Sequence, residues 1–214
     1  MINLKLKTIA SFVSPEDIVI DTCCDHAYLA IYLKQNHLCK EVYASDINIH
    51  ALEVARKNIT SSKLNITTYL SDGFKSINNS DIDTTVIAGV GANTVLDIID
   101  SAPQSIKKYI ISSNNNWDEL RFSLYQRGLY IQEEKVVLDK GKFYVIMFVT
   151  KDYVKENKIS LKYGKSNNQE YYLYLIKKEQ EVLAKIPRNK FMKRLNHKRN
   201  IYYLRKIIKR ISDC

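Results

Sequence analysis

The chain has 214 residues, of which 45% are hydrophobic and 26% charged, a composition typical of a soluble protein with one domain, or one domain and an appendage. No stretch approaches the ~20 apolar residues of a membrane span, and the opening residues lack the apolar core of a signal peptide. We therefore expect a cytoplasmic protein with no membrane partner. The four cysteines (Cys23, Cys24, Cys39 and Cys214) show no paired spacing, so we expect neither a metal site nor a disulfide scaffold.

The net charge of +10 is unevenly distributed along the chain. Residues 1–150 contain 15 Lys and Arg against 17 Asp and Glu, a net charge of −2, whereas residues 151–214 contain 18 against 6, a net charge of +12. A step of this size predicts that the C-terminal segment binds a polyanion. The alternative is a solvated helical face, which would normally interleave more acids than this segment has.

Strand and helix patterns alternate over the first 150 residues. This order predicts an α/β fold with a doubly wound sheet whose last strand runs antiparallel. A hairpin signal, Asp139-Lys140-Gly141, joins the final two strands. In chain order we expect a helix over 3–13, a strand over 18–21, a helix over 27–37, a strand over 41–46, a helix over 49–61, strands over 64–70 and 83–88, a helix over 94–101, a strand over 108–112, a helix over 117–128, and strands over 130–138 and 142–150.

A helical period of apolar residues begins after about residue 165 and is interrupted at Pro187. It predicts an antiparallel helical hairpin, or coiled coil, with a thin apolar seam and basic outer faces. Because such a hairpin needs a surface to lean on, we expect it to dock on the sheet domain. We place the sheet domain at residues 1–152 and the coiled coil at residues 153–214, with residues 151–169 as a polar connector.

Three expected parallel strands end in, or are closed by, an acid: Asp21, Asp46 and Asp72. The carboxyl ends of parallel strands are where open α/β sheets bind ligands, so any small-molecule site should form around residues 21–28. Asp46 is placed to accept hydrogen bonds from ribose hydroxyls. Asp72-Gly73 is placed to accept a hydrogen bond from the exocyclic amine of an adenine. Each acid alone is equally well explained as a turn residue, but three in register favour a nucleoside site.

The first turn, Thr22-Cys23-Cys24-Asp25, contains no glycine. A dinucleotide site needs glycines there to cradle a pyrophosphate, so NAD and FAD are disfavoured. A nucleoside cofactor without phosphates, such as S-adenosylmethionine, tolerates their absence better.

Several motifs resemble one known family. Asp25-His26-Ala27-Tyr28-Leu29 resembles the Asp-Ile-Gly-Ser-Asp-His-Ala-Tyr-Leu-Pro signature of the bacterial tRNA (adenine-N1)-methyltransferases that modify position 22, the TrmK type. Asp72-Gly73 is similar to the family's Gly-Asp-Gly, and residues 87–91 are similar to its Ile-Ala-Gly-Met-Gly-Gly. Asn114 is similar to the Asn of its Gln-Pro-Asn, and Arg121 follows at the family spacing. Residues 141–144 are similar to its Gly-Lys-x-Tyr. The resemblance covers about residues 4–150.

The resemblance implies a class I, Rossmann-like methyltransferase that transfers the methyl group of S-adenosylmethionine to N1 of the adenosine at position 22 of tRNA, without a metal and as a monomer. It implies catalytic roles for Asp25, His26 and Asn114, although His26 can equally be a helix-start residue that packs on its own turn. The implied cofactor-binding residues are Asp21, Cys23, Asp46, Ile47, Asp72, Gly73, Ala88 and Gly89.

The expected RNA-binding residues lie at the N-terminus, after the first turn and on the hairpin. They are Lys5, Lys7, Tyr28, Arg188, Lys190, Lys193, Arg194, Lys198 and Arg199. Tyr28 is equally well explained as a core residue. The hairpin residues suit RNA because its backbone is recognised by shape and phosphate contacts.

The chain departs from the family signature in its first turn, where Cys23 stands for Gly and Cys24 for Ser. It also has Ala30 for Pro, Ala92-Asn93 where the second Gly of a pair is usual, and Ser112-Ser113 for Gln-Pro. A Cβ at position 23 can crowd the methionine part of the cofactor. Two alternatives therefore stay open: an RNA-binding protein with a decayed cofactor pocket, and a methyltransferase acting on another RNA.

Overall fold

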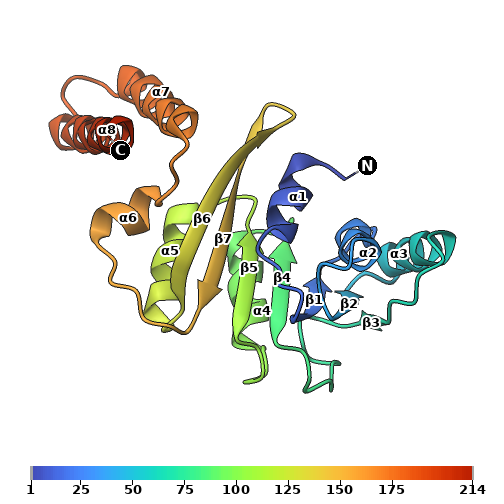
Figure 1. The fold of residues 1–214 in the computed structure, drawn as a ribbon. Helices are drawn as coiled ribbons and strands as arrows, with labels where there is room; N and C mark the ends of the chain where they lie inside the picture. The colour runs from blue at the N-terminus through green and yellow to red at the C-terminus, as the bar shows by residue number, and fades with distance from the viewer. Residues whose placement is uncertain (1, 214) are drawn as a thin grey trace.

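The computed structural model describes residues 2–213, so Met1 and Cys214, the outermost residues of the two expected domains, lie outside the described part. A seven-stranded sheet in the order β3-β2-β1-β4-β5-β7-β6 runs through the centre of the molecule (Figure 1). β7 pairs antiparallel with both neighbours, and the other pairs are parallel, as predicted. The strands are β1 (Ile18–Thr22), β2 (Glu41–Asp46), β3 (Thr68–Leu70), β4 (Thr84–Ala88), β5 (Lys108–Ser112), β6 (Tyr130–Asp139) and β7 (Lys142–Thr150).

Successive residues of the central strands pack on opposite faces of the sheet, as a period of two requires. Val19 and Val86 join the apolar cluster that contains residues of α1, α2 and α3, whereas Ile20 and Ile87 join the cluster that contains residues of α4 and α5. These helices are α1 (Leu4–Ala10), α2 (Tyr28–Gln35), α3 (Ile49–Ser61), α4 (Ala92–Asp100) and α5 (Trp117–Gln126). The fold is thus the doubly wound α/β sandwich predicted from the alternation.

Three predictions about the elements were wrong. The first helix, expected over 3–13, ends at Ala10. The third strand covers only Thr68–Leu70 at the sheet edge, so residues 64–67 precede it. The polar connector contains a further helix, α6 (Lys158–Tyr163). Asn157 caps α6 and Ser160 bonds back to the cap, so this short helix is specified by a capping box rather than by an apolar period.

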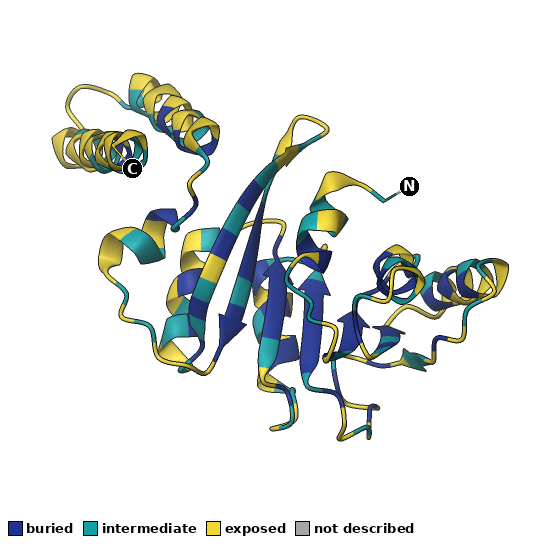
Figure 2. Ribbon diagram, viewed as in Figure 1, coloured by how far each residue is buried: buried dark blue, intermediate teal, exposed yellow. Residues whose placement is uncertain are grey.

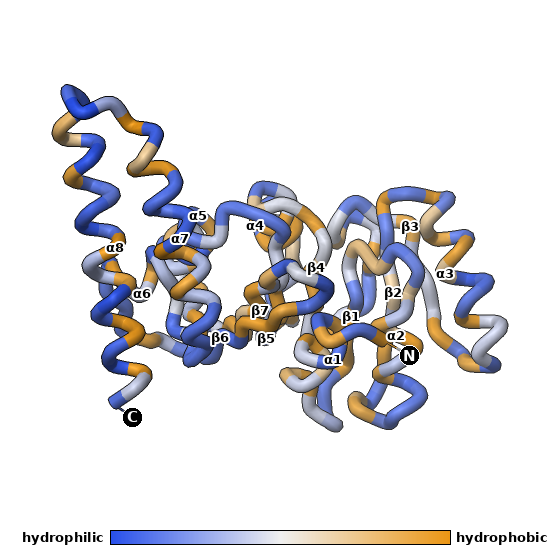
Figure 3. Tube along the Cα trace, turned by 90° about the horizontal axis from the view of Figure 1, so that it is seen from above, coloured by the Kyte–Doolittle hydropathy of each residue, from blue (hydrophilic) through white to orange (hydrophobic). Residues whose placement is uncertain are grey.

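The C-terminal hairpin consists of α7 (Gln169–Lys185) and α8 (Phe191–Ser212). Its root packs on the sheet domain, because Tyr171 contacts Trp117 of α5 and Phe143 of β7 at ring-centroid distances of 5.9 and 5.6 Å. Beyond Ile176, no residue of 177–200 is buried, and Figure 2 shows this outer half almost entirely exposed. In Figure 3 the hairpin stands along one side of the domain, and its polar turn is directed away from it. The expected docking therefore involves only the root.

A buried ion pair within the sheet domain anchors the connector that leads to the hairpin. Arg121 of α5 and Glu134 of β6 are almost fully buried and form two hydrogen bonds, of 2.7 and 3.1 Å. The backbone of Lys165 donates to the same carboxylate, and Arg121 donates to the carbonyl of Lys162. Gly164 has a φ of +85°, and a Cβ there would collide with Glu134, so only glycine fits at this crossing.

Candidate functional site

The three strand-end acids converge on the first turn. Asp21 of β1 pairs with Ala44 of β2, and Asp46 at the end of β2 pairs with Leu70 of β3, two residues before Asp72. Burial and the nearby negative charges of Asp46, Asp21 and Asp72 raise the pKa of the Cys23 thiol to about 12. The three acids come from the carboxyl ends of β1 and β2 and from the residue two positions after β3. The predicted convergence is therefore present, while the roles of the individual residues remain predictions.

Asp21 is the buried member of this group. Burial, and then the neighbouring charge of Asp46, raise its pKa to about 7, while the positive charge of Lys5 acts in the opposite direction. A carboxylate that is buried beside a second acid favours a cationic partner when it ionises. The ammonium group of an amino acid has the required charge.

Asp46 is fixed by backbone donors. Its carboxylate accepts hydrogen bonds from the backbone N–H of Asp25 at 3.1 Å and of Asn48 at 2.9 Å. A carboxylate offers about four acceptor positions, so the others are free for two ribose hydroxyls. Ile47, next in the chain, is 66% exposed and offers an apolar surface beside the carboxylate. An acceptor carboxylate beside an apolar surface suits the ribose and the base of S-adenosylmethionine.

The first turn uses left-handed backbone without glycine. Cys23, Asp25 and Ala27 have φ values of 60°, 49° and 57°. Each such residue costs about 1–2 kcal/mol, so the family's glycine would suit position 23. The Cys23 side chain packs against the cluster that contains Ile20 and Ile98. This packing explains how the turn forms without the usual glycine.

Asp72 lies at the outer rim of the site. Its side chain is 54% exposed and forms an ion pair with Lys75. Gly73 adopts a φ of +57°, and a Cβ there would lie 2.8 Å from the hydroxyl of Ser101. A glycine is thus required next to this acid for packing against α4.

The ends of β4 and β5 form the other side of the site. The side-chain amide of Asn114 donates to the carbonyl of Gly89 at 2.5 Å, and its backbone N–H donates to Val90 at 2.9 Å. The structure thus brings together the predicted Asn114, Ala88 and Gly89. Asn115, which the sequence did not single out, accepts from the backbone N–H of Ala92 and fixes the start of α4.

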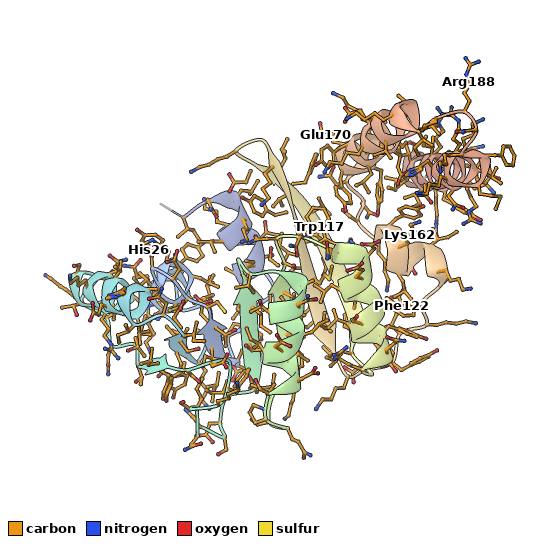
Figure 4. All side chains as sticks on the ribbon, turned by 180° about the vertical axis from the view of Figure 1, so that it is seen from behind. His26, Trp117, Phe122, Lys162, Glu170 and Arg188 are labelled. Carbon is orange, nitrogen blue, oxygen red and sulfur yellow. The ribbon has the colours of Figure 1, made fainter. Side chains whose placement is uncertain are left out.

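His26 combines features of both interpretations given above. Its ring lies 5.4 Å from the ring of Tyr28, as expected of a residue that packs on its own turn. Its Nε2 lies 3.5 Å from the Asp25 carboxylate, and its buried Nδ1 has no hydrogen-bond partner within residues 2–213. Figure 4 shows its position near α2. The catalytic prediction is therefore geometrically possible and remains a prediction.

Tyr28 and Lys7 line one hollow beside α2, with a volume of about 550 Å³. Tyr28 is 52% exposed, so the interpretation of this residue as part of the core was wrong. The predicted RNA-binding residues Tyr28 and Lys7 thus share an accessible surface near the first turn.

The predicted cations of the hairpin are mostly free on its surface. Arg188, Lys190, Lys193, Lys198 and Arg199 are exposed, and Figure 4 shows Arg188 at the end of the hairpin pointing outward. Arg194 differs, because its guanidinium donates to the carbonyls of Leu183 and Ile186 at 3.0 and 2.6 Å. Arg194 therefore closes the turn between α7 and α8.

Within the described chain, no cluster of three or more His, Cys, Asp or Glu could hold a metal ion. Nor does any helix among residues 2–213 have the length and apolar character needed to cross a membrane.

A family model described as a methyltransferase domain matches residues 2–147. A Mycoplasma genitalium protein assigned as a tRNA methyltransferase is 30% identical over 151 residues, which cover 69% of each chain. The structure of TrmK from M. capricolum with S-adenosylhomocysteine has a TM-score of 0.86 and 30% identity, and covers 99% of both chains. Sp1610 of Streptococcus pneumoniae, assigned as a tRNA (m1A22) methyltransferase, has a TM-score of 0.89 and 25% identity, covering 97% of this chain and 100% of that one.

These matches extend over the sheet domain in sequence and over nearly the whole chain in structure, including the helical hairpin. They agree with the motifs around the first turn and with the acids gathered there. The chain belongs to the methyltransferase family and, within it, to the TrmK group.

Proposed function

We propose that the protein transfers the methyl group of S-adenosylmethionine to N1 of the adenosine at position 22 of tRNA. The observation that carries this proposal is the position of Asp21, Asp46 and Asp72 at the carboxyl ends of the neighbouring strands β1, β2 and β3, beside a first turn whose Asp25 N–H donates to Asp46. The relatives with this fold include a protein solved with the cofactor product and one assigned as a tRNA (m1A22) methyltransferase.

The cofactor-binding residues divide by chemistry. Asp46 accepts the ribose hydroxyls, and Ile47 packs on the adenine of the cofactor. Asp72 and the backbone around Ala88 and Gly89 bind the adenine edge, and Asp21 binds the methionyl ammonium. S-adenosylmethionine, when bound, supplies an electrophilic methyl group.

The chain's own contribution to catalysis is alignment. N1 of adenine carries an available lone pair, so no strong base has to act first, and the barrier falls chiefly by holding N1 in line with the methyl group and excluding water. A paired adenine must leave the stack to expose N1, which lies on the Watson–Crick edge. We assign the contact with the base to Asn114, two residues after the end of β5. The carboxylate of Asp25 stabilises the positive charge that the methylated ring carries until N6 loses a proton.

The helical hairpin binds the phosphate backbone of the RNA. Its outer half has few acids and no buried residues, and its exposed lysines and arginines suit the phosphates of a folded RNA. Because the root is anchored on α5, β6 and β7, this basic surface keeps a fixed relation to the carboxyl edge of the sheet.

The test uses labelled S-adenosylmethionine and two unmodified tRNA transcripts that differ only at position 22, adenosine in one and guanosine in the other. Nucleoside mass spectrometry should find 1-methyladenosine in the first transcript and none in the second. Methylation of both transcripts would show that the enzyme methylates an adenosine at another position, and would favour another RNA as its substrate. No methylation, together with no binding of S-adenosylhomocysteine, would indicate a decayed pocket.

A further inference from the structure

The helix α1 places a lysine on the side that packs against the sheet. Asn3 caps this helix by accepting from the backbone N–H of Leu6 at 2.9 Å. Lys5 precedes the fully buried Ile9 by four residues, so the two side chains share one helix face. Lys5 is half-buried at a position where an amphipathic helix normally has an apolar residue. An ammonium group held there needs a functional or electrostatic explanation.

The neighbour of Lys5 is an aromatic ring on β7. Lys142, Tyr144 and Phe148 share one face of this strand, because they are separated by even numbers of residues. Phe12, just after α1, stacks on Phe148 at 5.7 Å, so the end of α1 lies over this face. The Nζ atoms of Lys5 and Lys142 lie 5.1 and 5.2 Å from the ring centroid of Tyr144, as cation–π contacts require.

The two ammonium groups repel each other. Burial lowers the pKa of Lys5, the charge of Lys142 lowers it further, and the charge of Asp21 raises it. In the part of the chain that the structure describes, neither lysine forms a salt bridge with an acid. An anion between them would remove the repulsion.

Lys142 lies away from the cofactor acids, whereas Lys5 extends between Lys142 and Asp21, whose charge acts on it. Asp21 is the penultimate residue of β1, whereas Lys142 begins β7, which lies three strand spacings away across the sheet in the order β1-β4-β5-β7, or about 14 Å. The ends of β4 and β5, with Gly89 and Asn114, lie between them.

Resting on the proposed function, we propose that Lys5 and Lys142, held on the ring of Tyr144, bind a phosphate of the RNA strand beside the adenosine that receives the methyl group. Lys142 is exposed at the start of β7, where the proposed RNA strand would pass. Lys5 extends from there toward the first turn. Tyr144 is a positioning residue, because it acts through the two lysines.

The test measures tRNA binding as a function of salt, without methyl transfer. Lys5→Gln and Lys142→Gln should each lower the magnitude of the slope of log K against log salt, and the double variant should lower it by about 1, the value for one phosphate contact. Lys142→Arg should keep the wild-type slope. The matched control is Lys107→Gln, an exposed lysine before β5 at the opposite edge of the sheet, which should change nothing.

A second measurement distinguishes two anions as the ligand of the lysine pair, an RNA phosphate and the carboxylate of the methionyl group. Under methyl transfer, Lys142→Gln should raise KM for tRNA about tenfold at unchanged kcat, the magnitude expected for one hydrogen bond to a charged group. It should leave the affinity for S-adenosylhomocysteine unchanged. Tyr144→Leu should behave like the lysine variants, and Tyr144→Phe like wild type.

An unchanged salt slope in both lysine variants would overturn the proposal. A loss of affinity for S-adenosylhomocysteine in Lys142→Gln would also overturn it, by assigning the pair to the methionyl carboxylate. If the slope falls as predicted but the wild-type chain forms no 1-methyladenosine, the phosphate site stands and the proposed function fails.

Discussion

The sheet domain and the outer half of the hairpin differ in burial and in charge. The sheet domain buries two apolar clusters and gathers acids at one edge, with a slightly negative net charge over residues 1–150. The outer half of the hairpin, residues 177–200, contains no fully buried residue and carries mostly positive charge. The domain is held by packing and can fix small groups precisely, whereas the hairpin depends on its root and offers a charged surface. The difference shows that the gathered acids and the largest basic surface lie in separate parts of the chain.

The buried ion pair that anchors the connector between these regions gives the largest expected effect on stability. Arg121→Met leaves Glu134 buried and without its partner, so we expect the free energy of unfolding to fall by about 3–5 kcal/mol in urea titrations. Arg127→Met, which removes an exposed ion pair with Asp100, should cost less than about 1 kcal/mol. The double variant Arg121→Met/Glu134→Leu should recover much of the loss. Equal effects of the two single variants would contradict this account.

The cofactor site gives the next largest effect. Asp46→Ala removes the acceptor of two ribose hydroxyls, so we expect affinity for S-adenosylhomocysteine to fall about 30- to 100-fold, or about 2–3 kcal/mol, by calorimetry. Asp72→Ala, at an exposed position, should weaken binding about tenfold or less. The unfolding temperature of each variant controls for loss of the fold. Unchanged binding in both variants would remove these acids from the cofactor site.

The buried Asp21 predicts a pH dependence. Because its pKa is raised to about 7, the fraction ionised rises about tenfold between pH 6 and pH 8, and the affinity for the cationic methionyl end should rise with it. The same shift destabilises the free fold as pH rises from about 4 to 7, because the folded state then retains the proton that the unfolded state loses. Asp21→Asn should flatten both profiles. A wild-type affinity that falls with pH over this range would contradict the assignment.

The first turn gives the smallest effect. Cys23→Gly relieves left-handed strain at a φ of 60° and loses a little packing, so we expect a gain of about 0.5–1 kcal/mol, or about 2 °C in Tm. Cofactor affinity should stay within about twofold of wild type, because the Cys23 side chain packs on the apolar cluster. A large gain in affinity would show that Cys23 crowds the cofactor.

Much of the fold was predictable from local patterns. The buried strands Ile18–Thr22 and Thr84–Ala88 are apolar runs that end in turn residues, and the strand-end acids follow from the same pattern. The sheet order and the register that bring Asp21, Asp46 and Asp72 together then follow from general rules of doubly wound sheets.

The remaining features depend on contacts between distant segments. Arg121 and Glu134 are 13 residues apart, and their pairing beneath Gly164 has no sequence period to reveal it. The α6 helix depends on a capping box within a polar stretch. Lys5 and Tyr144 meet only because α1 crosses β7, although a lysine on the apolar face of a helix was a signal that could have been used.

The division of labour is tested most directly by methyl-transfer kinetics of the full chain and of the variant Lys190→Gln/Lys193→Gln/Lys198→Gln, with tRNA concentration varied and 1-methyladenosine as the product measured. The account predicts a KM for tRNA that rises steeply in the variant, with kcat and the affinity for S-adenosylhomocysteine unchanged. A fall in kcat at constant KM, or no methylated adenosine with either protein, would contradict it.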